Sequence, residues 1–232
     1  MSGKLIVFEG TDGSGKSTQF QLACQALRAR GTDFGTMVFP RYREESSALV
    51  RLYLGGAFGS HPSDVNAYAA STFYAVDRYA GYKQDWGGYY EGGGLMVADR
   101  YTTSNAVHQA SKLDAEEREE FFRWLADFEY GRLGLPRPDL VLWMDMPLEL
   151  SVANLRRREA DTHTKGDIHE VDTGYLAACR QAAAQAAQFY GWRRIGCAQG
   201  DAPRSVEDIH REVMDILSRS LQDKYNIDQG GH

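Results

Sequence analysis

The sequence predicts an α/β fold in which a mostly parallel sheet is covered by helices on both faces. Three observations lead to this class. Short apolar runs alternate along the chain with segments of helical periodicity. The runs are apolar at successive positions, as in strands that are buried on both faces. A glycine-rich turn follows the first run, and ligands of such sheets bind beyond the carboxyl ends of the strands.

The predicted strands are short, apolar and bounded by turn residues or charges. They are residues 4–9, 34–39, 95–99, 139–145 and 193–198. Helical segments separate them, which is the alternation expected of a parallel sheet.

Apolar residues at spacings of three and four predict the helices between these strands. The positions are Phe20, Ala23 and Leu27; Val65, Tyr68, Ala69, Thr72, Phe73 and Val76; Phe121, Leu125 and Phe128; Leu148, Val152 and Leu155; and Val206, Ile209, Val213, Ile216 and Leu217. Ser205 is expected to cap the last helix. The glycine-rich stretches 55–60 and 87–94 are expected to be loops, and residues 226–232 a flexible tail.

Composition points to one ordinary globular domain over residues 1–225. The chain has 232 residues, of which 43% are hydrophobic, enough to bury a sizeable core. Its formal net charge of −6 disfavours nucleic-acid polymers as partners, because their backbone attracts basic proteins. Since no apolar stretch reaches about 18 residues, we expect no membrane span. Cys24, Cys179 and Cys197 are widely spaced, which favours reduced core thiols and a cytoplasmic location.

A complete phosphate-binding motif follows the first predicted strand. Residues 10–17 match G-x-x-x-x-G-K-[ST] and open a helix, the context that the motif requires, which disfavours a turn without a ligand. Glycines let the backbone wrap around a phosphate, and amide groups at the helix N-terminus point at the anion. Lys16 is expected to reach the β and γ phosphates of a nucleoside triphosphate, and Ser17 to offer a hydroxyl to Mg²⁺. The motif alone does not identify the nucleotide or the class of enzyme. The residues predicted to bind the triphosphate, ATP by the resemblance given below, are Gly10, Thr11, Asp12, Gly13, Ser14, Gly15, Lys16, Ser17 and Thr18.

The third predicted strand narrows the class of enzyme, because it runs into the sequence VADRY at residues 97–101. An acid followed by an arginine suits a small-molecule kinase. Asp99 is expected to hold a water on Mg²⁺, and Arg100 to face the phosphate of the acceptor. A GTPase would need an N-K-x-D stretch to read guanine, and the sequence contains none.

With these motifs in place, the chain resembles the thymidylate kinase family of P-loop nucleoside monophosphate kinases. The matching stretches run in the family's order: FEGTDGSGKSTQ (8–19), FPRYR (39–43), FYAVDRYA (73–80), ADRYTTSN (98–105), LPRPDLVLWMDMP (135–147) and SVEDIHREV (205–213). The resemblance implies a three-layer α/β/α P-loop kinase fold with a five-stranded parallel sheet and a mobile lid. It also implies transfer of the γ-phosphate of ATP to dTMP, giving dTDP, with Mg²⁺ as cofactor. Family members are commonly homodimers, to which the helix at residues 67–79 could contribute.

The resemblance assigns roles around the acceptor. The family's counterpart of Asp12 contacts the sugar hydroxyl, and Asp12 is counted with Lys16 and Arg100 among the catalytic residues. The counterparts of Arg78 and Arg100 hold the base and the phosphate, and an arginine fork can bind a phosphate through two hydrogen bonds. The counterpart of Tyr74 stacks on thymine.

Two of these roles have plain structural alternatives. Tyr74 could pack in the core on the apolar stripe of its helix, as could its neighbour Phe73. The spacing of four residues between Tyr74 and Arg78 favours Tyr74 over Phe73 for the stacking role. Arg78 could instead form a surface ion pair with Asp77 or Asp85.

The stretch FPRYR offers two arginines at a point where the family has one that binds phosphate. Arg43 is preferred over Arg41 as the ligand of the acceptor phosphate, and a role in a solvated loop is the alternative. The family also implies that adenine meets backbone groups near residues 197–199.

The lid is expected at about residues 156–170. Some family members carry a catalytic arginine inside the phosphate loop, where this chain has Gly13, whereas others keep it in the lid. Gly13 therefore points to Arg157 or Arg158, with Lys165, as the cations that close over the ATP phosphates, because phosphoryl transfer needs positive charge there. The clustered arginines could also be a solvated helix end that the helix dipole favours.

Two departures from the family concern histidines. The family often has Tyr or Phe nine residues after the D-R-Y aspartate, near the sugar 2′ carbon, and here that position is His108, followed by Gln109. Both are candidates for substrate binding, and His108 leaves discrimination between deoxyribose and ribose open; a partly exposed helix histidine is the alternative. The lid carries His163 and His169, whose spacing does not favour a Zn²⁺ site.

Three other functions stay open. A deoxynucleoside kinase would want a carboxylate base, which Glu44 or Glu45 could supply, but arginines around the acceptor favour a phosphorylated one. A nucleotide kinase of broader specificity is compatible with His108. A non-catalytic nucleotide-binding regulator is disfavoured, because a mere binder need not keep Lys16 and Asp99.

Overall fold

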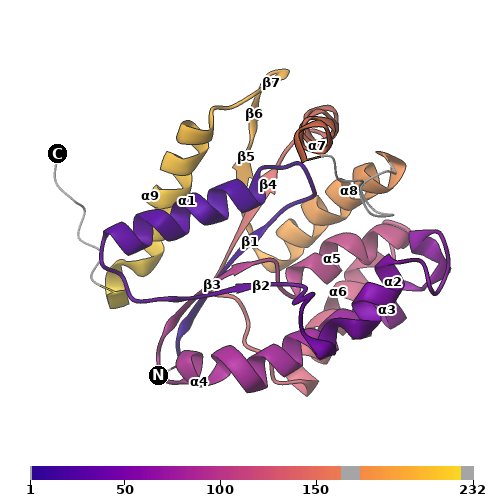
Figure 1. The fold of residues 1–232 in the computed structure, drawn as a ribbon, viewed down its shortest axis with the longest axis horizontal. Coiled ribbons are helices and arrows are strands. Elements are labelled where there is room, and N and C mark those ends of the chain that lie inside the picture. The colour runs from indigo at the N-terminus through magenta and orange to yellow at the C-terminus, as the bar shows by residue number, and fades with distance from the viewer. Residues whose placement is uncertain (1, 163–172, 226–232) are drawn as a thin grey trace.

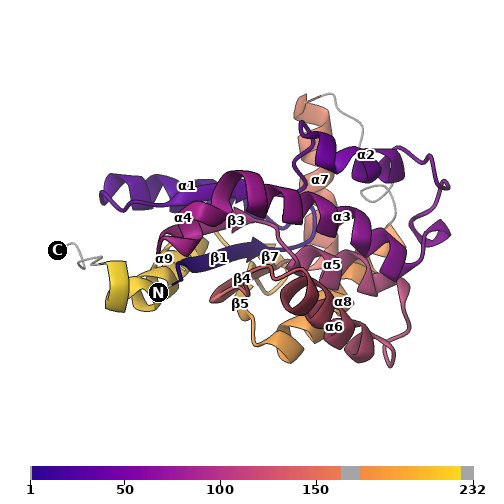
Figure 2. The same ribbon diagram turned by 90° about the horizontal axis from the view of Figure 1, so that it is seen from below.

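A computed structural model describes residues 2–162 and 173–225 of the chain (Figures 1 and 2). The strands are β1 (Lys4–Glu9), β2 (Gly35–Val38), β3 (Leu95–Asp99), β4 (Leu140–Asp145), β5 (Arg193–Gly196) and the short hairpin of β6 (Ala198–Gln199) and β7 (Ala202–Pro203). The α-helices are α1 (Lys16–Ala29), α2 (Ala48–Leu54), α3 (Ala67–Gly81), α4 (Gly87–Glu91), α5 (Thr103–His108), α6 (Arg118–Ala126), α7 (Leu148–Thr162), α8 (Thr173–Tyr190) and α9 (Val206–Tyr225). Short 3₁₀ turns are η1 (Glu45–Ser47), η2 (Pro62–Asp64) and η4 (Ala110–Lys112), and π-helical turns are η3 (Tyr82–Trp86) and η5 (Asp127–Arg132).

The main sheet is parallel, with strand order β2-β3-β1-β4-β5. The predicted five-stranded parallel sheet with helices on both sides is therefore confirmed. Central strand β1 pairs with β3 on one side and β4 on the other, so that Phe8 lies opposite Asp99 and Glu9 lies opposite Trp143. This register brings the residues that follow β1 and β3 to the same edge of the sheet, where the strand order reverses.

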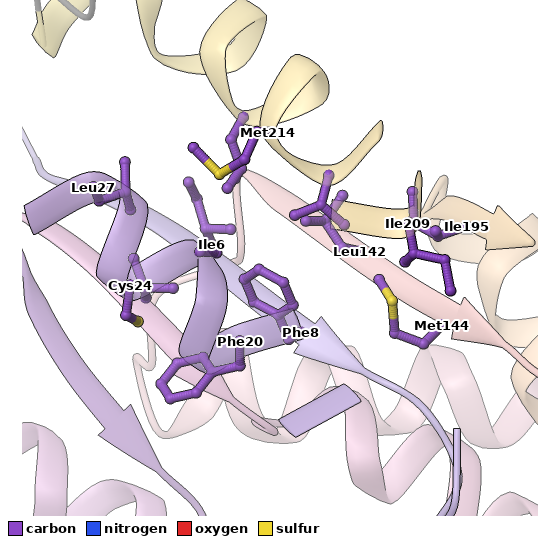
Figure 3. Packing of buried hydrophobic residues seen from close by; sticks show 14 of the residues in the cluster. Ile6, Phe8, Phe20, Cys24, Leu27, Leu142, Met144, Ile195, Ile209 and Met214 are labelled. Carbon is purple, nitrogen blue, oxygen red and sulfur yellow. The ribbon is translucent and has the colours of Figure 1, made fainter. Parts of the chain in front are cut away.

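Alternate residues of β1 enter two different cores, which explains why the strand is apolar throughout. Ile6 and Phe8 pack with α1 and α9, whereas Leu5 and Val7 pack with η3 and α4 on the opposite face. Figure 3 shows the first core, in which Phe20 of α1 meets Phe8 at a ring-centroid separation of 5.8 Å. In Figure 1, α1 and α9 lie side by side, while α5, α6 and α8 cluster on the other side of the sheet.

The predicted buried face of α3 is wrong. Tyr68 and Val76 were expected to face the core, but they are 39% and 51% exposed, and the buried positions carry Ala70, Ala75 and Arg78. Helix α2 and the turn η1 approach α3 closely, which favours small side chains at its buried positions. Hydrophobic periodicity alone does not reveal such close packing of small side chains.

The predicted loop at 87–94 is also wrong in part, because α4 occupies its first five residues. A Cβ atom on Gly87 would lie 2.3 Å from the carbonyl oxygen of Tyr82, so this glycine permits a close approach within the helical turn rather than a flexible loop. Strand β2 is one residue shorter at each end than predicted, and β5 is two residues shorter at its C-terminal end. Differences of this size are normal for element boundaries.

Two smaller predictions are confirmed. Ser205 caps α9, because its Oγ accepts a hydrogen bond of 3.0 Å from the backbone N–H of Asp208. Cys24, Cys179 and Cys197 are buried free thiols. Burial raises the pKa of the Cys24 thiol to about 11, which keeps that thiol protonated at neutral pH.

Among the described helices, none is long and apolar enough to cross a bilayer.

Helix α7 rests directly on the phosphate loop. The side-chain amide of Asn154 donates a hydrogen bond of 2.8 Å to the carbonyl of Gly13. Gly13 has a φ of +78°, and a Cβ atom there would lie 2.3 Å from the carbonyl oxygen of Ser151. Any side chain at position 13 would therefore push α7 away, which gives a physical reason why this chain carries no arginine in the loop.

We expect Gly13→Ala to lower the free energy of unfolding by about 2 to 4 kcal/mol, from left-handed backbone strain together with overpacking against α7. The measurement is urea unfolding at equilibrium. Gly88→Ala is the matched control, because open space surrounds that position in α4, and it should leave stability equal or slightly higher. A midpoint for Gly13→Ala equal to that of the unmodified protein would contradict the close packing of α7.

Candidate active site

The phosphate loop turns from β1 into α1 through two left-handed glycines, Gly13 at φ +78° and Gly15 at φ +84°. The backbone N–H of Ser14 donates to the carbonyl of Thr11 at 3.1 Å, which closes the turn. The amide groups at the start of α1 are thereby presented beyond the carboxyl end of β1, in the arrangement that binds phosphate. The predicted ATP-binding stretch thus forms one turn that continues into the first residues of α1.

Lys16, Ser17 and Asp99 meet at this turn, although 83 residues separate the first from the last. Lys16 contacts the Asp99 carboxylate, and Ser17 Oγ donates to Asp99 Oδ2 at 2.9 Å. Burial lowers the pKa of Lys16, as does the charge of Arg100, against the opposing effect of Asp99 and Glu9. The oxygens of Ser17 and Asp99 fit Mg²⁺, a hard cation that takes few protein ligands beside substrate phosphates.

A cavity of about 150 Å³ opens next to the loop, at the carboxyl ends of β1 and β3. Six of the seven residues predicted to bind the acceptor line it: Asp12, Tyr74, Arg78, Arg100, His108 and Gln109. The seventh, Arg43, is exposed and lies outside this lining. The Oε1 atom of Gln109 is buried without a hydrogen-bond partner in the structure, so it offers an acceptor to a ligand N–H group.

Arg100 lies between the phosphate loop and the cavity. Its Nη2 donates to Asp12 Oδ1 at 2.6 Å, and its Nη1 lies 3.6 Å from Glu9 Oε1. Its backbone is left-handed, with φ +69°, and its N–H donates to the carbonyl of Phe8 at 3.1 Å. Such a conformation in a non-glycine residue is strained, and the surrounding contacts must maintain it.

The charges around Arg100 and Asp12 keep both residues ionised. Burial tends to lower the pKa of Arg100, but the carboxylates of Asp12 and Glu9 outweigh it and raise that pKa. Burial likewise tends to raise the pKa of Asp12, whereas Arg100 and other nearby cations lower it overall. Asp12 is therefore an anionic hydrogen-bond acceptor beside the cavity, as a contact with a sugar hydroxyl requires.

His108 contacts the same arginine. Arg100 Nη1 lies 2.9 Å from His108 Nε2, and a guanidinium can only donate, so Nε2 accepts and the proton lies on Nδ1. Nδ1 lies 3.2 Å from the hydroxyl of Tyr175, and the two rings stack at 28°. His108 is thus a partly exposed histidine at the end of α5 whose imidazole contacts Arg100 and Tyr175.

The surface ion pair considered for Arg78 is wrong. Arg78 is 1% exposed and its guanidinium binds Glu129, with both contacts at 2.6 Å. Asp77 and Asp85 instead hold Arg41, whose backbone N–H also donates to Asp77 at 2.8 Å. Arg41 is therefore committed to its own carboxylates, and a phosphate-binding role for Arg43 stays a prediction.

The neighbouring aromatic residues Phe73 and Tyr74 both pack against Tyr53, at ring-centroid distances of 6.3 Å and 6.4 Å. Phe73 also packs at 5.6 Å from Phe58, whereas Tyr74 lines the cavity. The stacking role assigned to Tyr74 is compatible with this placement.

The proposed lid arginines lie on α7, close to the loop that this helix contacts. Arg157 and Arg158 are exposed, and Arg157 Nη2 lies 3.4 Å from Asn154 Oδ1. The charge of Arg158 contributes to the lowered pKa of Asp12, so this guanidinium acts on the active site electrostatically. Lys165 and the lid residues His163 and His169 lie outside the described residues.

Four residues that sequence reasoning missed belong to the site. Glu9 is fully buried and accepts from the N–H of Gly10 at 2.8 Å, and Asn105, Glu129 and Tyr175 contact the cavity residues or line the cavity. The available signal was an acid at the end of an apolar strand for Glu9, and an acid within the aromatic run 128–130 for Glu129.

Comparison with known proteins agrees with this geometry. The family model for thymidylate kinase matches residues 8–213. A thymidylate kinase of Mycobacterium tuberculosis (strain ATCC 25618 / H37Rv) is 35% identical over 170 residues, which cover 72% of this chain and 78% of the relative. One of Nostoc punctiforme is 26% identical over 221 residues, covering 95% of this chain and 100% of the relative.

The solved structure of the thymidylate kinase from Candida albicans has the same fold, with a TM-score of 0.70 at 19% identity over 96% of this chain and 94% of that one. The phosphate loop, the cavity and the base of α7 all fall within the residues that the family model matches. The chain belongs to the thymidylate kinase family of ATP-dependent nucleoside monophosphate kinases.

Proposed function

We propose that the protein transfers the γ-phosphate of ATP to dTMP and releases ADP and dTDP, with Mg²⁺ as cofactor. The observation that carries this proposal is the position of Arg100, which directly follows β3, binds the anionic Asp12 of the phosphate loop and lines the cavity. A cation at this point suits an acceptor that is already phosphorylated. The thymidylate kinases among the relatives support dTMP as that acceptor.

In the proposed mechanism the chain positions two anions and stabilises the charge between them. The loop amides and Lys16 hold the ATP phosphates, Arg100 orients the acceptor phosphate, and Asp12 holds the sugar hydroxyl. An oxygen of the acceptor phosphate attacks the γ-phosphorus, the bond to the β–γ bridging oxygen breaks, and ADP leaves. Because the attacking oxygen is already anionic, no general base is required. Ser17 and Asp99 would hold Mg²⁺, which would supply positive charge to the ATP phosphates.

A second candidate is a nucleotide kinase of broader specificity. His108 occupies the position where the family resemblance implies a larger ring near the sugar, and its imidazole is hydrogen-bonded to Arg100. The Candida albicans thymidylate kinase, a structural relative, has broad substrate specificity. A deoxynucleoside kinase has less support, because Glu44 and Glu45 are exposed and lie outside the cavity lining.

The proposal extends to the assembly and location of the enzyme. Apolar side chains of α2 and α3 are exposed, namely Leu49, Leu52, Tyr68, Val76 and Tyr79. They would be covered in a homodimer formed through these helices. The three reduced, buried thiols favour the cytoplasm, and the net charge of −6 disfavours nucleic-acid partners.

The function is tested by following ADP release from ATP and Mg²⁺ with a panel of nucleosides and monophosphates. Release stimulated by dTMP supports the proposal. Turnover of thymidine without turnover of dTMP would identify a deoxynucleoside kinase, and the absence of acceptor-stimulated ADP release would favour a non-catalytic nucleotide-binding regulator.

The double variant Arg157→Ala/Arg158→Ala should lower kcat about 100-fold or more, since positive charge over the transferring phosphoryl group is lost. Arg211→Ala, which removes an exposed arginine paired with Asp208 on α9, is the control and should keep its activity. Steady-state kinetics with dTMP measure both. An unchanged kcat in the double variant would assign the arginine cluster to a solvated helix end.

Replacing His108 by Tyr should increase discrimination against a 2′-hydroxyl. We expect the ratio of kcat/KM for dTMP to that for ribothymidine 5′-monophosphate to rise about tenfold, because a larger ring crowds the sugar. The ratio cancels any general loss from the broken contact with Arg100. If both substrates change by the same factor, His108 has no part in sugar selection.

A further inference from the structure

A buried carboxylate lies behind the end of the acceptor cavity that is lined by Arg78 and Asn105. Glu129 is fully buried on the π-helical turn η5, and its own side chain lies outside the cavity lining. Its neighbours hold the turn in place: Phe128 stacks on Trp124 at 5.1 Å, and the hydroxyl of Tyr130 contacts that of Thr102. The residues before and after Glu129 in the chain therefore hold its carboxylate in place.

Glu129 determines which groups of Arg78 face the cavity. Its Oε2 accepts from Nε and its Oε1 from Nη2, each at 2.6 Å. A third N–H of Arg78, on Nη1, points to the carbonyl of Tyr101 at 3.4 Å. A guanidinium has five N–H groups, so two remain to donate to a ligand. The ion pair also balances the charge of Arg78, so these N–H groups form a donor site without a net charge.

Glu129 determines the orientation of Asn105 in the same way. One hydrogen of the Asn105 amide nitrogen goes to Glu129 Oε1 at 3.0 Å and the other to the carbonyl of Ser71 at 3.1 Å. With both hydrogens committed, the amide presents only its oxygen, Oδ1, as an acceptor. The end of the cavity lined by Arg78 and Asn105, where the base of the acceptor would bind, thus combines donors from Arg78 with an acceptor from Asn105.

This polarity matches one class of pyrimidine. A 2,4-dioxo base carries an oxygen at C4 that accepts and an N3–H that donates, whereas a 4-amino base has a donor at C4 and an acceptor at N3. A 4-amino base would face donor with donor and acceptor with acceptor, and unpaired buried polar groups are costly.

We propose that Glu129 is a positioning residue that fixes Arg78 as donor and Asn105 as acceptor, and thereby sets the preference of this enzyme for 2,4-dioxo over 4-amino pyrimidine nucleotides. The inference rests on the proposed function, because it takes the cavity as the acceptor site. Glu129 acts through its two partners and needs no contact with substrate.

The test compares dTMP with dCMP on three variants of the full chain. Glu129→Gln keeps the shape of the side chain, but its amide nitrogen cannot accept, so one of the contacts to Arg78 or Asn105 is lost and the arginine is no longer neutralised. Glu129→Asp keeps the charge but is too short to hold both partners. Asp127→Asn is the matched control, because it breaks an exposed carboxylate–arginine pair with Arg132 on the same turn.

We expect the dTMP to dCMP ratio of kcat/KM to fall at least about tenfold in Glu129→Gln, mainly through KM for dTMP, while KM for ATP stays within about twofold. Glu129→Asp should give an intermediate ratio, and Asp127→Asn the ratio of the unmodified protein. Calorimetric titration with dTMP and dCMP gives a second measurement that does not depend on turnover, and the same fall in selectivity should appear there.

An unchanged ratio in folded Glu129→Gln would overturn the proposal. If that variant does not fold, Glu129→Asp decides: a lowered ratio supports the role of Glu129, and an unchanged one overturns it. The proposed function fails separately, when the unmodified protein does not turn over dTMP. In that case calorimetry still decides the present inference, because loss of selective dTMP binding in the variants supports it and retained selectivity overturns it.

Discussion

The guanidinium of Arg100 connects three segments of the active site, namely the phosphate loop, the end of β1 and helix α5. It donates to Asp12 of the phosphate loop, lies near Glu9 at the end of β1 and contacts His108 of α5. Its left-handed backbone is held by a hydrogen bond to Phe8. If this guanidinium were displaced, the contact that connects the phosphate loop to the lining of the cavity would be lost.

The site is built from charges that are costly to bury unless they are paired. Lys16 lies against Asp99, Arg78 against Glu129, and Glu9 accepts hydrogen bonds from Thr103 and the amide of Gly10. Removal of one partner from such a buried pair costs about 3 to 5 kcal/mol, because the other charge stays buried and unpaired. The same contacts that orient the catalytic groups therefore also constrain how the sheet edge can fold.

The glycine at position 13 serves the phosphate loop and α7 at once. Its positive φ lets the loop turn around a phosphate, and the lack of a side chain lets α7 approach until Asn154 reaches the loop carbonyl. Arg157 and Arg158 continue along that helix. Contact between the loop and the helix thus links the position of these arginines to the phosphate loop, and it leaves no room for a side chain at position 13 of the loop.

Sequence alone determined the elements whose signal is local. The central strands β1, β3 and β4 could be predicted because they are buried on both faces and apolar over most of their length. The expectation of burial on both faces is wrong for the edge strands β2 and β5, which are partly exposed because each has a neighbour on one side only. The phosphate loop could be predicted because its glycines, lysine and serine are neighbours in the chain. Six residues of the cavity lining were predicted as well, since residues such as Asp12, Arg78 and Arg100 lie in stretches that resemble a known family.

Only the tertiary structure decided the contacts between segments distant in the chain. The pairing of Arg78 with Glu129 spans 51 residues, and that of Asp12 with Arg100 spans 88. No periodicity reports such contacts, because they depend on the register of β1 against β3 and on how helices pack. The buried face of α3 shows the same limit: its small residues face the core because neighbouring helices approach closely, and apolarity along one helix carries no information about that distance.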